Sequence, residues 1–160
     1  RVVAVARDGR ELVDQCRIGR PDLVITDIKM PRMDGLAAAR EIYRSGPVPL
    51  VFVTGYSAPD SVGSTADFIL AYLVKPVGEP ELRAAIDTVM ERFEEFAALT
   101  RETGDASEAL DAWRLSRRVK ERLAETEGLS EAQAAEYVRA LARDGGERVV
   151  DVLRRLAKQG

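Results

Sequence analysis

The first half of the chain alternates short runs of branched apolar residues with amphipathic stretches, and this alternation constrains the fold more than any other feature. The apolar runs are Val2–Ala6, Leu23–Asp27, Val51–Thr54 and Tyr72–Lys75. Between them, Gly9–Arg17 and Gly35–Tyr43 have the spacing of amphipathic helices. Strands that alternate with helices predict an α/β protein with a parallel sheet. Within Gly55–Ala71 several small polar residues weaken the expected helix, so we expect a short or mobile one.

Three of these runs end on a polar side chain of a different kind. They end on the carboxylate of Asp27, the hydroxyl of Thr54 and the ammonium of Lys75. Open α/β sheets bind their ligands at the carboxyl ends of the strands. Because the chain contains no histidine, this combination of an acid, a hydroxyl and an amine predicts a site that accepts a phosphoryl group.

Residues 21–77 closely resemble the receiver domain of two-component response regulators. The resemblance rests on Asp27 and the Pro/Gly loop after it, on Thr54, and on Lys75-Pro76. It implies a flavodoxin-like doubly wound parallel sheet in which Asp27 is the phosphoacceptor. Thr54 and Lys75 would each bind a phosphoryl oxygen. The resemblance also implies a cis peptide bond between Lys75 and Pro76, and a switch in which Tyr72 moves when Thr54 is drawn toward the phosphoryl group.

The same resemblance implies a divalent cation, Mg²⁺, because the carboxylate and the incoming phosphate repel each other. In this family Mg²⁺ is held by the phosphoacceptor Asp27, by the backbone carbonyl two residues on, here Lys29, and by an acidic pair after the first strand. That pair would precede Val2, so we expect the first strand and helix of the natural protein to lie N-terminal to Arg1. In the strand order 2-1-3-4-5, the first strand would lie between the Val2–Ala6 strand and the strand that ends at Asp27.

Beyond Val77 the periodicity is helical. Five apolar residues repeat with the four-three spacing of a coiled-coil seam, and these are Leu82, Ile86, Val89, Phe93 and Phe96. Two interpretations of this seam remain open. It could pair two chains into a homodimer through residues 82–96, with the two aromatic residues exposed in a single chain, or it could pack against the chain's own C-terminal helices.

The last part of the chain predicts three short helices with glycine-marked turns. Gly128 ends the first and Gly145-Gly146 the second. Ser130–Gln133 has the pattern of a capping box that opens the second helix. Asp105 or Ser107 could cap the first. Such a set predicts a small helical bundle.

Position and pattern in this bundle resemble the ANTAR domain, an RNA-binding antitermination module that is often fused to receivers. The best local match is Gly128–Glu131 with Lys120 before it. We therefore expect a receiver domain at residues 1–92, a helical linker and possible coiled coil at 93–106, and an ANTAR-like output domain at 107–160.

Basic residues on the first bundle helix are the candidates for RNA binding. They are Arg114, Arg117, Arg118, Lys120 and Arg122. The three arginines spaced four apart share one helix face with Arg117, and such a stripe binds phosphates. The alternative is a solvated face with acidic partners at Glu121 and Glu125. The net charge of -3 gives no general attraction to nucleic acid.

The sequence therefore predicts a phosphorylation-controlled response regulator, a signalling protein whose only reaction would be its own dephosphorylation. Its expected partners are a sensor histidine kinase or phosphotransfer protein, structured RNA, and a second copy of itself. The alternative is a receiver whose helical tail serves dimerisation or protein docking without RNA. No apolar run approaches the roughly 20 residues that span a membrane. The single cysteine, Cys16, suits a reducing compartment, so we expect a cytoplasmic protein in which Cys16 is a buried apolar residue.

Overall fold

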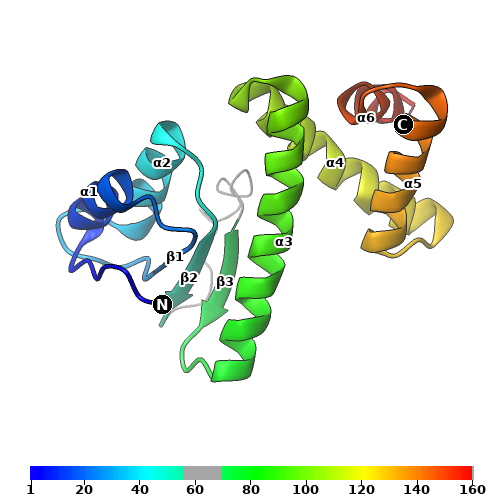
Figure 1. Cartoon of the computed structure of the whole chain (residues 1–160). Coiled ribbons are helices and arrows are strands. Elements are labelled where there is room, and N and C mark those ends of the chain that lie inside the picture. Colours follow the sequence, from blue (N-terminus) through cyan, green and yellow to red (C-terminus); the bar gives the residue numbers. More distant parts are fainter. Residues whose placement is uncertain (56–69, 160) are drawn as a thin grey trace. The chain divides into compact units, whose positions relative to one another are not determined.

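The computed structural model describes residues 1–55 and 70–159 (Figure 1). The chain divides into two compact units, Arg1–Phe93 and Glu94–Gly160, which are described in turn. Most of the segment predicted to hold a short or mobile helix, Gly55–Ala71, lies outside the described residues.

The N-terminal unit is a parallel α/β layer structure. Its elements are α1 (Gly9–Gly19), β1 (Val24–Thr26), α2 (Gly35–Ser45), β2 (Leu50–Thr54), β3 (Leu70–Val74) and the first part of α3 (Glu79–Thr103). The described strands form one sheet in the order β1-β2-β3, and both pairings are parallel. Figure 1 shows α1 and α2 on one side of this sheet and the start of α3 on the other. This arrangement confirms the predicted flavodoxin-like parallel fold.

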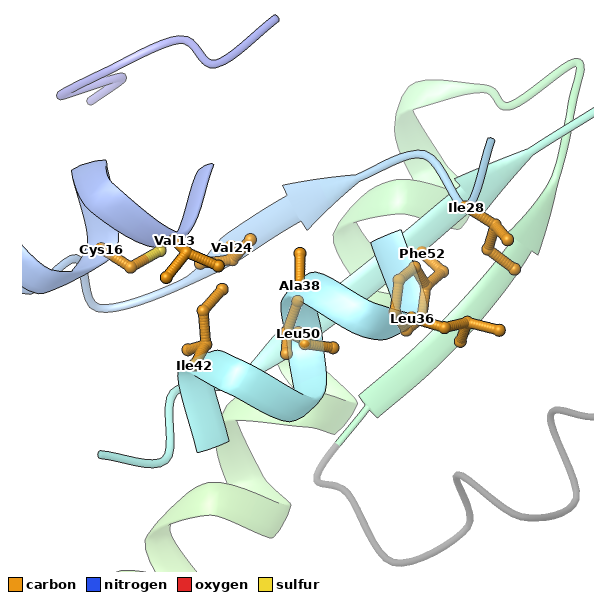
Figure 2. Close-up of a cluster of buried hydrophobic side chains, with 10 residues drawn as sticks. Val13, Cys16, Val24, Ile28, Leu36, Ala38, Ile42, Leu50 and Phe52 are labelled. Carbon is orange, nitrogen blue, oxygen red and sulfur yellow. The ribbon is translucent and has the colours of Figure 1, made fainter. Parts of the chain in front are cut away.

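The core of this unit lies between the sheet and the helix pair α1 and α2 (Figure 2). Val13 and Cys16 of α1 meet Ile42 of α2 there, and Leu50 and Phe52 of β2 complete the cluster with exposures of 8% or less. Leu50 and Phe52 alternate along β2, so both point to the same face of the sheet. Cys16 is a buried free cysteine, as predicted, and burial raises the pKa of its thiol.

Residues 2–6 are not a strand, contrary to the sequence prediction. Val2, Val3 and Val5 are 63–80% exposed, and no described strand pairs with this segment. A strand needs a neighbour for its backbone hydrogen bonds. The predicted strand order does not place residues 2–6 beside β1. Among the described strands, β1 pairs only with β2.

The C-terminal unit contains a three-helix bundle made of α4 (Ala106–Glu127), α5 (Glu131–Gly145) and α6 (Val149–Ala157). Each of these helices contacts the other two. The predicted turn chemistry is present. Asp105 caps α4 by accepting from the Glu108 amide, and Gly128 ends that helix with a φ of 67°. The capping box formed by Ser130 and Gln133 opens α5.

The predicted seam on α3 is largely covered within a single chain. Val89 and Phe96 are 0% and 4% exposed, and Phe93 is half-buried. Phe96 is therefore not the exposed aromatic that a dimer seam needs. Residues 94–103 of α3 belong to the C-terminal unit.

Two hydrogen bonds show how the end of α3 is attached to the bundle. Glu95 accepts from Ser116 of α4 at 2.5 Å, and Glu102 accepts from the Val150 amide at the start of α6 at 3.2 Å. Among the described residues, no helix is long and apolar enough to cross a membrane.

Candidate functional site

The three predicted site residues meet at one edge of the sheet. Asp27 directly follows β1, Thr54 is the last residue of β2, and Lys75 directly follows β3. Because the strands are parallel and adjacent, their carboxyl ends lie together. The Lys75 amide also donates to the Thr54 carbonyl oxygen at 2.8 Å, which extends the pairing of β2 and β3 to the site.

The carboxylate of Asp27 is held by two donors. The Lys75 ammonium donates to Asp27 Oδ2 at 2.6 Å, and the Lys29 amide donates to Oδ1 at 3.1 Å. The Asp27 side chain remains 30% exposed. It is thus both oriented by its neighbours and open to a reagent from solvent. Thr54, at the end of the neighbouring strand β2, is buried.

Opposing influences act on the pKa of the Asp27 carboxyl group. Partial burial raises this pKa, whereas the hydrogen bonds from Lys75 and from the Lys29 amide, together with the charge of Lys75, lower it. The net effect is a pKa below the ordinary value for an aspartate. The group is therefore an anion at neutral pH, which is the form that a nucleophile requires.

A glycine fixes the backbone behind the carboxylate, and sequence reasoning did not single it out. Gly35 is buried at the start of α2, and its amide donates to the Ile28 carbonyl at 2.8 Å. A Cβ atom at this position would overlap the carbonyl oxygen of Asp27. The loop between β1 and α2 can therefore close onto Asp27 only with a glycine at position 35.

Other residues near the site were also named in the sequence analysis or lie in the adjoining loops. The Lys75-Pro76 peptide bond is cis. Tyr72 lies on β3 opposite Phe52, half-buried against the core. Asp8 and Asp34 are helix caps, for α1 and α2 respectively, and Asp8 is buried in an ion pair with Arg32.

The residues that the resemblance assigns to Mg²⁺ fit the chemistry of that ion in type. Asp27 supplies carboxylate oxygens and Lys29 a backbone carbonyl oxygen, and Mg²⁺ is commonly bound through one or two carboxylates plus water and phosphate oxygens. Among the described residues, no three histidine, cysteine or acidic side chains form a complete metal cluster.

The predicted RNA-binding residues fall into two groups in the bundle. Arg114 pairs with Asp111 at 3.0 Å, and Arg117 pairs with Glu121 at 3.7 Å and lies over the ring of Trp113. Arg118 and Arg122 form no ion pair within the described residues, and the Arg122 guanidinium donates to the Leu156 carbonyl at 2.7 Å.

Lys120 does not lie on this basic face. Its side chain is 7% exposed, and its ammonium lies 2.9 Å from Glu95 of α3 and 3.3 Å from Glu131 of α5. A phosphate would have to displace both carboxylates to reach it. The Lys120 ammonium is therefore not available on the basic face of α4. Its contacts with two other helices were not predicted, because neither partner is near it in sequence.

Comparison with known proteins agrees with this geometry. A family model described as the response regulator receiver domain matches residues 1–87. Transcriptional regulatory protein PdtaR of Mycobacterium tuberculosis is 39% identical over 144 residues, which cover 89% of this chain and 70% of PdtaR. A protein-glutamate methylesterase/protein-glutamine glutaminase of Nitrosospira multiformis is 38% identical over 96 residues, but these are only 27% of that protein.

Among solved structures, the N-terminal domain of a response regulator/sensory box/GGDEF 3-domain protein from Carboxydothermus hydrogenoformans is similar to this chain. The TM-score is 0.50 at 27% sequence identity, over 56% of this chain and 74% of that one.

Proposed function

Because this chain belongs to the response regulator receiver family, we propose that it is a phosphorylation-controlled regulator whose phosphoacceptor is Asp27. The observation that carries this proposal is the hydrogen bond of 2.6 Å between Asp27 and Lys75, next to the buried Thr54. This arrangement presents an oriented carboxylate anion beside a cation. The cation can then pair with the negative charge that the phosphoryl group brings.

The donor would be the phosphohistidine of a sensor histidine kinase or phosphotransfer protein. An oxygen of Asp27 attacks phosphorus, and a new O–P bond forms as the P–N bond of the phosphohistidine breaks. The departing imidazole nitrogen keeps the bonding electron pair and takes a proton from water. Asp27 and the Lys29 carbonyl would hold Mg²⁺, whose charge offsets the repulsion between the carboxylate and the phosphoryl group. Thr54 and Tyr72 would form the switch that responds to the acyl phosphate.

Phosphorylation of the full chain by acetyl phosphate and Mg²⁺ tests the acceptor. We expect one added phosphate by intact mass, and none in Asp27→Asn. Asp34→Asn is the matched control, because Asp34 is an exposed carboxylate of the same loop and asparagine caps a helix nearly as well. Undiminished labelling of Asp27→Asn would disprove the assignment.

For the output we propose that the C-terminal bundle is an ANTAR-like module that binds structured RNA in transcription antitermination. The support is its three-helix pattern, the α4 residues Arg118 and Arg122, which have no ion pair among the described residues, and the similarity to a transcriptional regulatory protein over 89% of the chain. Binding of the phosphorylated full chain to a labelled RNA hairpin, which should weaken steeply with salt, tests the proposal. If no hairpin binds at any salt concentration, a protein-docking output becomes the better explanation.

A further inference from the structure

A hollow of about 480 Å³ lies between α4 and α6, and cationic side chains from both helices line it. Arg118 and Arg122 come from α4, Arg154 comes from α6, and Lys158 is the C-cap of α6. None of the lining residues is acidic. The volume is within the range of pockets that hold small ligands, roughly 300–1,000 Å³.

Three of the four cations of the hollow differ from the other bases of the bundle, which lie within 3.7 Å of a carboxylate oxygen. These neutralised residues are Arg114, Arg117, Lys120, Arg139, Arg143, Arg148, Arg154 and Arg155. Within the described part of the bundle, Arg118, Arg122 and Lys158 form no ion pair, and all three line the hollow.

Uncompensated like charges around one hollow repel one another, and a bound anion relieves that repulsion. Two of the cations are already held in place. Arg122 donates to the Leu156 carbonyl at 2.7 Å, and Arg154 lies 2.7 Å from Glu108. These two side chains would lose little freedom when an anion binds, and this lowers their part of the cost of binding.

The remaining lining is apolar. Leu115 and Val119 of α4 and Ala157 of α6 complete the wall. An inorganic anion gains nothing from contact with this apolar surface, whereas a ribose or base next to a phosphate would pack against it. Guanidinium groups also match the geometry of phosphate oxygens, which they bind in a bidentate manner.

We propose that the hollow between α4 and α6 binds a backbone phosphate of RNA through Arg118, Arg122 and Lys158, an inference that rests on the proposed RNA-binding function of this unit. The RNA surface then extends from α4 onto α6. It does not follow the single α4 face that carries Arg114 and Arg117, whose charges are already paired.

Two full-chain variants with equal loss of charge test this site. Arg118→Gln with Lys158→Gln removes two cations of the hollow, and Arg139→Gln with Arg143→Gln removes two exposed cations of α5 that pair with Glu136. Binding of a fluorescein-labelled RNA hairpin is followed by anisotropy at several salt concentrations, and thermal unfolding checks the fold. We expect at least a roughly tenfold loss for the hollow variant, with a salt slope shallower by roughly one to two. The α5 variant should stay within about threefold of the parent.

A second ligand separates failure of the site from failure of the function. Tripolyphosphate is titrated into the full chain while the amide NMR signals of α4 and α6 are followed. If RNA binds and the hollow variant equals the α5 variant, the hollow is wrong and RNA binding stands. If no RNA binds but tripolyphosphate shifts these signals in the parent and not in the hollow variant, the RNA function is wrong and the phosphate site stands. If neither ligand binds, both are wrong.

Discussion

At the scale of single residues, Lys75 is the charged partner of Asp27, the proposed phosphoacceptor. Its ammonium lies 2.6 Å from Asp27 Oδ2 and helps to keep the pKa of that carboxyl group low. A folded-state pKa below the unfolded value means that the ionised form of Asp27 stabilises the fold at neutral pH. That contribution is lost as the pH falls through the folded-state pKa.

Replacing Lys75 with methionine should therefore raise the pKa of Asp27 and weaken the dependence of stability on pH in the acid range. The ¹³C signal of the Asp27 carboxyl carbon, followed by NMR against pH, measures the first effect, and urea unfolding at several pH values measures the second. Arg83→Gln is the control, since Arg83 pairs with Glu79 and not with the site. An unchanged titration of Asp27 in Lys75→Met would contradict the role given to Lys75.

Gly35, unlike Lys75, contributes to the site by having no side chain. A methyl group there overlaps the Asp27 carbonyl oxygen, so Gly35→Ala should cost about 1–3 kcal/mol of unfolding free energy. It should also slow phosphorylation by acetyl phosphate. Gly19→Ala is the matched control, because nothing lies within 4 Å of its added Cβ at the end of α1. Equal stability of the two variants by urea unfolding would show that the loop between β1 and α2 accommodates the added methyl group without cost.

At the scale of elements, one buried ammonium joins three helices. Lys120 of α4 reaches Glu95 of α3 and Glu131 of α5, and Ser116 donates to the same Glu95 carboxylate. Removing one partner of a buried pair leaves an uncompensated charge. Glu95 is 29% exposed and keeps its hydrogen bond from Ser116, so Lys120→Met should destabilise the bundle by about 1–3 kcal/mol. Glu131 is 67% exposed, so Glu131→Gln should change stability by less than about 1 kcal/mol.

Chemical denaturation of both variants checks this expectation. If Lys120→Met is as stable as the parent, then the apolar side chain compensates for the lost ion pairs. The contacts of Lys120 with α3 and α5 then add nothing to the free energy of unfolding.

The elements also show what sequence reasoning could and could not predict. Helix ends were predictable where a local signal exists, as at Gly128 and Ser130, because capping depends on residues only a few positions apart. The three strand-end residues were predictable for a similar reason, since each one ends its own apolar run. The hollow was missed because Lys158 and Arg118 come from different helices, and only the packing of α6 on α4 brings them together.

At the scale of the whole molecule, the two aromatic residues of the predicted coiled-coil seam on α3 differ in exposure. Phe96 is buried in a single chain and Phe93 is half-buried, so only Phe93 has surface left for a second copy. Phe96→Ala should cost about 3–5 kcal/mol of stability. If a phosphorylated homodimer forms through residues 82–96, which is one of the two interpretations that the sequence leaves open, Phe93→Ser should weaken it without unfolding the chain. Sedimentation velocity with and without acetyl phosphate measures this, and an unchanged association of Phe93→Ser would exclude the seam.

The chain has one tryptophan, and Trp113 is 2% exposed in the core of the C-terminal bundle. Its indole emission therefore reports on that unit alone, because the N-terminal unit contains no tryptophan. Burial shields the ring from water, so its emission should shift to longer wavelength when the bundle unfolds, whatever the state of the receiver. The proposed phosphoryl transfer to Asp27 would take place in the unit without tryptophan. Any change in this emission on adding acetyl phosphate to the native chain would therefore be an optical record of the receiver communicating with its output.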